Sequence, residues 1–142
     1  MKILLIDDNT RLLEEVKAIL VRNGHSVDCM DNAKDAVALL NERQYDFVLV
    51  DYMMPVHNGI WFMKNISLPR RTKALLVTSY VDRNVIRQMF NAGISGYVVK
   101  PFDEEELLRH LQFHSRNHTE RQAAGDKGCV CKEGEKKAEE KK

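Results

Sequence analysis

The sequence predicts an α/β protein built on a doubly wound parallel sheet. Two observations support this fold class: apolar runs alternate with helical patterns along the chain, and each apolar run is continuous rather than interrupted by polar residues. Parallel strands that helices cover on both faces read as continuous apolar runs. Five repeats of a strand and a helix favour one sheet with helices on both faces. The expected strands are residues 3–6, 26–30, 47–50, 74–77 and 97–99.

The expected helices follow these strands. Asn23-Gly24 supplies a stop signal for the first helix, and Asp31 is the expected N-cap of the second. The later helices are expected at about residues 58–66, 83–92 and 103–115. The apolar stripe of the first helix consists of Leu12, Leu13, Val16, Ile19 and Leu20, and the inner face of the second consists of Ala33, Ala36, Val37 and Leu40.

Four of the five expected strands end in polar residues. In an open parallel sheet, ligands bind beyond the carboxyl ends of the strands, where the strand order reverses. We therefore expect three carboxylates, a hydroxyl and an ammonium at one edge. A single Asp after a strand is usually a turn former or a helix cap, but that interpretation does not account for four strand ends together. The residues are Asp7 and Asp8 after the first strand, Asp51 after the third, Thr78 and Ser79 after the fourth, and Lys100 after the fifth.

These side chains favour a metal site that handles phosphoryl groups. Clustered carboxylates repel one another unless a hard cation lies among them, and Mg²⁺ suits them because it prefers oxygen ligands. Bound Mg²⁺ can accept phosphoryl oxygens, to which Lys100 offers a charge and Thr78 a hydrogen bond. Asp51 is then a carboxylate nucleophile that would form an acyl phosphate.

These motifs closely resemble those of the response regulator receiver family of two-component signalling. The resemblance covers about residues 1–117 and implies the chemotaxis-type receiver fold, a flavodoxin-like sheet with strand order 2-1-3-4-5. Two mild departures are Ser79, where the family most often has Ala, and the aromatic pair Trp61-Phe62. Because residues 60–63 would sweep about 300° of a helix, we expect at least one aromatic side chain there to be exposed. The motif residues are Asp7-Asp8, Asp51, Met53-Met54-Pro55, Gly59, Thr78-Ser79 and Lys100-Pro101-Phe102.

The resemblance implies a role for each residue of the acidic pocket. Asp51 would be the phosphorylated residue, and Asp8 and Asp51 would bind Mg²⁺ directly. Asp7 would act mainly through a metal-bound water, and the backbone carbonyl of Met53 would complete the protein ligands.

The resemblance also implies a conformational switch. Thr78 and Lys100 would contact the phosphoryl group. Tyr97, three residues before Lys100, would be the switch aromatic, which enters the space that Thr78 vacates when it moves toward the phosphate. Tyr97 would then remodel the surface formed by the helix near 83–92, the fifth strand and the last helix, where a homodimer partner or a target protein would dock. The Lys100–Pro101 peptide bond is expected to be cis.

The implied function is a response regulator receiver that takes a phosphoryl group on Asp51 from a sensor histidine kinase or a phosphotransfer protein. It would catalyse only its own phosphorylation and dephosphorylation, and so would not be an enzyme toward external substrates. One alternative is a Mg²⁺-dependent phosphohydrolase, but such enzymes need a cap or substrate domain for which the chain has no room. Another is a receiver cut from a longer regulator, whose charged tail would lead to an output domain.

The composition limits the partners and the location. Lys and Arg number 22 and Asp and Glu number 21, so no global field favours nucleic acid and no direct nucleic-acid partner is expected. No apolar stretch approaches the roughly 18 residues needed to span a bilayer, and three cysteines give no disulfide framework, so we expect a cytoplasmic protein without membrane insertion. Residues 118–142 are rich in charged and small residues, and we expect a disordered or loosely helical tail, in which Cys129 and Cys131 have no assigned role.

Overall fold

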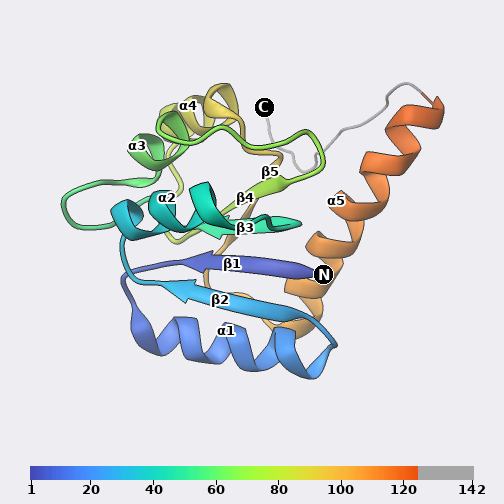
Figure 1. Ribbon diagram of the computed structural model, residues 1–142, viewed down its shortest axis with the longest axis horizontal. Coiled ribbons are helices and arrows are strands. Elements are labelled where there is room, and N and C mark those ends of the chain that lie inside the picture. Colours follow the sequence, from blue (N-terminus) through green and yellow to red (C-terminus); the bar gives the residue numbers. More distant parts are fainter. Residues whose placement is uncertain (125–142) are drawn as a thin grey trace. The chain divides into compact units, whose positions relative to one another are not determined.

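The computed structural model describes residues 1–124, with side chains described as far as residue 115. The chain divides after Glu104 into two compact units, and the first unit, Met1–Glu104, contains the sheet. The sheet has five parallel strands in the order β2-β1-β3-β4-β5, which confirms the predicted fold class and strand order (Figure 1). The strands are β1 (Lys2–Ile6), β2 (Ser26–Met30), β3 (Phe47–Val50), β4 (Lys73–Thr78) and β5 (Gly96–Val99).

Helices alternate with these strands, as the sequence predicts. Within the first unit, α1 lies on one face of the sheet and α2, α3 and α4 lie on the other (Figure 1). The helix α3 is shorter than the expected range of 58–66, and α5 continues well beyond residue 115. Residues 125–142, which include most of the expected tail with Cys129 and Cys131, lie outside the described residues. The helices are α1 (Thr10–Arg22), α2 (Ala33–Glu42), α3 (Gly59–Lys64), α4 (Arg83–Ala92) and α5 (Glu104–Ala124).

The N-cap of α2 corrects the prediction made for Asp31. Asn32 is the cap, because its side chain accepts a hydrogen bond of 2.8 Å from the backbone N–H of Asp35. Asp31 instead accepts a 2.8 Å bond from the side-chain amide of Asn32. Both residue types cap helices well, so their local propensities could not separate them. The stop signal of α1 is confirmed, with Asn23 as its C-cap followed by Gly24 at φ 91°.

The strands β1, β3 and β4 are buried on both faces, which explains their continuous apolar runs. On the side of α2, α3 and α4, the cluster includes Leu4 and Ile6 of β1 together with Val48 and Val50 of β3. These four side chains are all within 1% of complete burial. Because each strand is sandwiched between helices, no polar face is needed and no alternation develops. The buried residues of α1 are Leu13, Val16 and Leu20.

The aromatic pair in α3 is less exposed than expected. Phe62 is completely buried and Trp61 is half-buried. Trp61 is covered by His57, whose ring stacks on it with centroids 3.7 Å apart and planes at 15°. The expectation of an exposed aromatic side chain is therefore wrong, because the loop before α3 folds back over the helix.

Among the residues that the structure describes, no helix combines the length and the apolar character required to cross a membrane.

Candidate functional site: an acidic pocket at the carboxyl edge of the sheet

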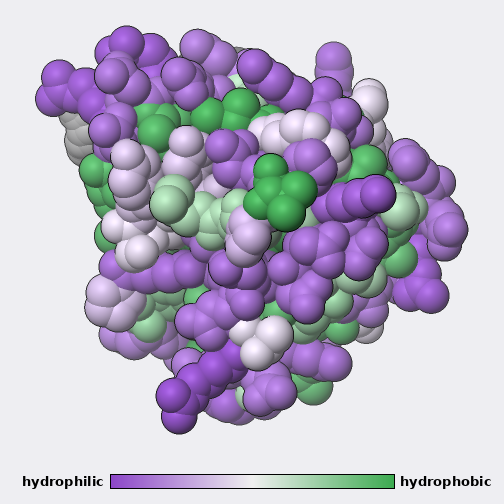
Figure 2. Space-filling model, turned by 90° about the vertical axis from the view of Figure 1, so that its left-hand side faces the viewer, coloured by the Kyte–Doolittle hydropathy of each residue, from purple (hydrophilic) through white to green (hydrophobic). Residues whose placement is uncertain are grey.

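Three carboxylates meet where the two central strands end. Asp7 follows β1 and Asp51 follows β3, and the register pairs Ile6 with Val50, so the two aspartates leave the sheet at the same level. The ligand oxygens of Asp7, Asp8 and Asp51 lie within 4.8 Å of one another. Figure 2 views this side of the molecule, toward which the arrowheads of β1 and β2 point in Figure 1. Hydrophilic residues dominate it, with patches of hydrophobic residues between them.

The pocket is largely withdrawn from solvent. Asp7 and Asp51 are 5% and 6% exposed, whereas Asp8 lies at the surface. One oxygen of Asp7 accepts a hydrogen bond of 2.9 Å from the backbone N–H of Asn9. Asn9 is also the N-cap of α1, where its side chain accepts a bond from the N–H of Leu12. The turn between β1 and α1 thus fixes Asp7 and starts the helix with the same residue.

Lys100 supplies the positive charge of the pocket from the edge strand β5. Its Nζ donates to Asp7 at 2.7 Å and lies 3.6 Å from Asp51. Asp7 follows β1, from which β5 is separated by β3 and β4, so this ion pair joins the ends of strands that are not neighbours in the sheet. Its backbone N–H donates to the Thr78 carbonyl, and the Lys100–Pro101 bond is cis, as predicted.

Thr78 brings a hydroxyl to the same pocket from β4. It is only 1% exposed, and its Oγ1 accepts a hydrogen bond of 3.0 Å from the backbone N–H of Tyr80. A hydroxyl can accept and donate at the same time, and the Thr78 hydroxyl also donates to the Asp51 carboxylate, which lowers the pKa of Asp51. Ser79, the departure from the family pattern, is exposed.

The electrostatic balance of the pocket is negative. Burial raises the pKa of Asp51, and the nearby charge of Asp7 raises it further. Lys100, the Thr78 hydroxyl and the Tyr52 backbone N–H oppose this rise only in part. Three carboxylates therefore face one ammonium in a partly dry space, a situation that a hard divalent cation would relieve. The donor set fits such a cation, and the cluster could bind a metal.

Gly59 holds the loop after β3 close to Asp51. A Cβ at Gly59 would lie 2.8 Å from the Asp51 carbonyl oxygen and 3.1 Å from the Tyr52 Cα, so no side chain fits without a shift of the backbone. The N–H of Gly59 donates to the Tyr52 carbonyl at 2.9 Å. In this loop Met54 is buried and Met53 is 55% exposed.

Two features of the pocket were not foreseen from the sequence. Asn9 anchors Asp7, and its place two residues after the aspartate is the only sequence signal of that role. The rings of Tyr52 and Tyr80 stack beside the pocket, with centroids 5.4 Å apart and planes at 12°. No local pattern indicates that contact, because the two residues lie in different loops.

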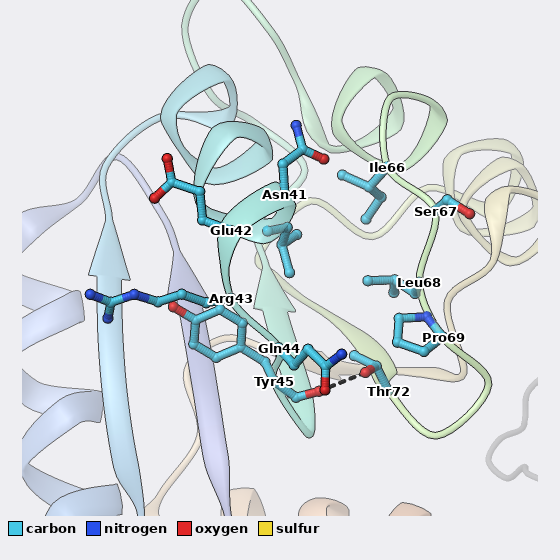
Figure 3. A pocket seen from close by; sticks show the side chains of 11 residues that line it. Asn41, Glu42, Arg43, Gln44, Tyr45, Ile66, Ser67, Leu68, Pro69 and Thr72 are labelled. Carbon is cyan, nitrogen blue, oxygen red and sulfur yellow. Dashed lines mark hydrogen bonds between the residues drawn. The ribbon is translucent and has the colours of Figure 1, made fainter.

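A separate cavity of about 250 Å³ lies between the end of α2 and the connection from α3 to β4 (Figure 3). None of the predicted site residues lines it. Several of its polar groups are paired: the Thr72 hydroxyl donates to the Tyr45 carbonyl at 2.6 Å, and the Tyr45 hydroxyl donates to Asp28. Gln44 at the rim accepts a hydrogen bond from Arg71.

The profile of the response regulator receiver domain family matches residues 3–112. The chain belongs to the response regulator receiver family. The receiver is 33% identical over 111 residues to the transcriptional regulatory protein ResD of Bacillus subtilis, which is 78% of this chain and 46% of ResD. It is 31% identical over 124 residues to the virulence regulator PhoP of Salmonella choleraesuis, 84% of this chain and 54% of PhoP. The chain thus spans about half the length of these curated relatives.

Solved receiver structures resemble this receiver over most of their length. A CheY-like receiver domain protein from Methanospirillum hungatei superposes with a TM-score of 0.79 at 25% identity, covering 84% of this chain and 97% of the other. The receiver domain of the sensor histidine kinase PA1611 from Pseudomonas aeruginosa has a TM-score of 0.71 at 28% identity, covering 78% and 93%. In that protein a magnesium ion is coordinated in the active site cleft.

Proposed function

We propose that the receiver accepts a phosphoryl group on Asp51 in a Mg²⁺-dependent reaction, from a sensor histidine kinase or a phosphotransfer protein. The observation that carries the proposal is the convergence of Asp7, Asp8 and Asp51 within 4.8 Å, with the Lys100 ammonium reaching the same group. The receiver would catalyse only its own phosphorylation and dephosphorylation, and the phosphate on Asp51 would serve as a signal.

Mg²⁺ would be held by the carboxylates of Asp8 and Asp51 and by the backbone carbonyl of Met53, with Asp7 acting through a bound water. Mg²⁺ prefers oxygen ligands and keeps several waters, which suits a pocket with one exposed and two buried carboxylates. The related PA1611 receiver, with magnesium in its cleft, supports this choice of cation. When bound, the ion would neutralise negative charge on the transferring phosphoryl group.

In the transfer step, an Asp51 carboxylate oxygen attacks the phosphorus of a phosphohistidine. The new O–P bond forms as the P–N bond breaks, and the electron pair of that bond returns to the imidazole nitrogen of the donor. Lys100 and Thr78 would stabilise the phosphoryl oxygens, since both already direct hydrogen bonds or charge toward Asp51. The buried position of Asp51 keeps bulk water from competing with the donor.

The signal would leave the pocket through Thr78 and Tyr97. Tyr97 of β5 is half-buried and meets the Phe90 ring of α4 edge to face, with centroids 6.3 Å apart. Phe90 and Val99 are 42% and 39% exposed, so the surface of α4 and β5 presents apolar side chains. We propose that this surface takes part in docking a second copy or a target protein when Tyr97 changes position.

Phosphorylation of variants by acetyl phosphate in Mg²⁺, followed by intact-protein mass spectrometry, tests the acceptor. The parent should gain one phosphoryl group, and Asp51→Asn should gain none because the nucleophile is lost. Asp8→Asn should also fail, through loss of Mg²⁺. Asp31→Asn is the matched control, since Asp31 is exposed and lies outside the pocket, and it should be phosphorylated like the parent. A full adduct on Asp51→Asn would show that another residue is the acceptor.

A further inference from the structure

The stacked rings of Tyr52 and Tyr80, the tyrosine stack, join two loops that flank the acidic pocket. Tyr52 lies in the loop after β3, next to Asp51, and Tyr80 lies in the loop after β4, two residues beyond Thr78. The rings are nearly parallel, at 12°, with centroids 5.4 Å apart. This offset-stacked arrangement is one that aromatic pairs favour.

The Tyr52 side of the stack is firmly held. Its carbonyl accepts a 2.9 Å hydrogen bond from the N–H of Gly59, and its ring packs against the buried cluster beneath α2, α3 and α4. Its own N–H contributes a hydrogen bond to the Asp51 carboxylate. Tyr52 is thus a fixed platform whose backbone already belongs to the pocket.

The Tyr80 side is exposed at the surface. Tyr80 is 42% exposed and the next residue, Val81, is 55% exposed. Yet the backbone N–H of Tyr80 donates a 3.0 Å hydrogen bond to Thr78 Oγ1, and the Thr78 hydroxyl lowers the pKa of Asp51 by donating a hydrogen bond to its carboxylate. Tyr80 therefore contacts the pocket hydroxyl through its backbone and Tyr52 through its ring.

We propose that Tyr52 and Tyr80 are positioning residues for phosphoryl transfer: the tyrosine stack fixes the loop after β4, and the Tyr80 N–H then aims the Thr78 hydroxyl at the acceptor. This inference rests on the proposed function of Asp51 as phosphoryl acceptor. Because the stack is proposed to act through the Thr78 hydroxyl, its loss should lower the reaction rate and leave the affinity for donor and Mg²⁺ unchanged.

The test measures the phosphorylation rate of the full chain against acetyl phosphate concentration at saturating Mg²⁺. Tyr80→Leu and Tyr52→Leu should each lower the maximal rate by about 2- to 12-fold, the factor that an aromatic pair can contribute. The acetyl phosphate concentration for half-maximal rate should stay the same. Tyr80→Phe keeps the ring and should retain the parent rate. The double variant should be no slower than the slower single variant, because the two rings act as one unit.

A Thr78→Ala background separates positioning from a general structural effect. Thr78→Ala lacks the hydroxyl that the stack aims, so adding Tyr80→Leu to it should cause no further loss. A further loss in that background, or a Tyr80→Leu single variant that matches the parent, would overturn the inference. Failure of the parent itself to be phosphorylated on Asp51 would instead overturn the proposed function. Because Tyr80 is exposed, its variants should fold, and circular dichroism of each variant verifies this.

Discussion

At the scale of single residues, Asp51 is a buried carboxylate that lies beside a second carboxylate. Asp51 is only 6% exposed, and the second carboxylate is that of Asp7. Burial and the Asp7 charge raise its pKa, and Lys100 offsets this only in part. Ionisation of Asp51 therefore lowers the free energy of unfolding of the metal-free protein. In the proposed function, the same buried position holds the nucleophile where the phosphoryl group arrives.

This cost predicts that the free energies of unfolding of the parent and of Asp51→Asn differ by an amount that depends on pH. Because the folded-state pKa of Asp51 lies above the unfolded value, the folded state binds the proton more tightly, and the parent loses stability as pH rises between the two values. Without divalent cations, Asp51→Asn should therefore have a higher free energy of unfolding than the parent at neutral pH, because the variant has no buried carboxylate to ionise. The difference should shrink as the pH falls into the acid range, because protonation of the Asp51 carboxyl removes the cost of burying its charge.

Urea denaturation in EDTA from acid to neutral pH measures the difference, and Asp31→Asn, at an exposed aspartate outside the pocket, serves as the matched control. Added Mg²⁺ should reverse the order at neutral pH, because a cation that binds the folded parent stabilises it and the variant lacks a ligand. A gain for Asp51→Asn that is independent of pH, or no gain at all, would contradict the electrostatic account.

At the scale of elements, the loop from β3 to α3 contains a strained turn at Val56 and ends at Gly59, where the backbone lies close to that of Asp51. Gly59 allows the backbone to pass within contact distance of Asp51. Val56, in contrast, has φ 71° and is 92% exposed, and the N–H of His57 donates to the Pro55 carbonyl across it at 2.8 Å. This is a γ-turn with positive φ, a conformation that is rare and strained for a β-branched residue. The turn brings His57 onto Trp61.

Val56→Gly should therefore stabilise the protein. A left-handed conformation costs an L-residue about 1–2 kcal/mol, while the added chain entropy of Gly costs about 0.5–1 kcal/mol, so the expected net gain is about 0.5–1 kcal/mol. Urea denaturation measures it. The matched control is Val81→Gly, a valine that is 55% exposed and is not among the described residues with positive φ; it should destabilise. Equal losses in both variants would show that Val56 is not strained.

At the scale of the whole molecule, the sheet order determines which strands lie between the acidic pocket and the proposed docking surface of α4 and β5. The proposed acceptor, Asp51, follows the central strand β3, Thr78 ends its neighbour β4, and Tyr97 lies on the edge strand β5 beyond it. The strands of Thr78 and Tyr97 are direct neighbours in the sheet, and Tyr97 contacts the Phe90 ring of α4. In the proposed switch, a movement of Thr78 toward the phosphate would therefore reach Tyr97 first. The phosphate need only bias two conformations, and a change from 1:99 to 99:1 takes about 5.5 kcal/mol.

Thr78→Ala should separate phosphorylation from the signal. Charge-assisted hydrogen bonds contribute roughly 1.5–3 kcal/mol each, so losing the Thr78 bond removes a large part of the bias while Asp51 and Lys100 remain. The variant should still take a phosphoryl group, more slowly. Beryllofluoride, a phosphoryl mimic, should change amide exchange over Arg83–Ala92 and Gly96–Val99, together with the oligomeric state, in the parent but much less in Thr78→Ala. A full response in Thr78→Ala would exclude this route through Thr78 and Tyr97.

The sequence by itself determined the fold class, the strand order through the family resemblance, and the convergence of Asp7, Asp8 and Asp51. These features rest on local signals, because a buried parallel strand reads as a continuous apolar run and its end marks the edge where ligands bind. The register of β1 and β3 then necessarily brings the two buried aspartates together.

The tertiary structure alone decided the choice of Asn32 over Asp31 as a cap, the burial of Phe62, the cover of His57 on Trp61, and the tyrosine stack. Each of these depends on the direction in which a loop leaves its strand or enters its helix. Several paths are open to Asn- and Asp-containing loops at nearly equal local free energy, and only contacts between segments distant in sequence select one. That is why the loops, which contain Tyr52 and Tyr80, were the part of the site that the sequence left open.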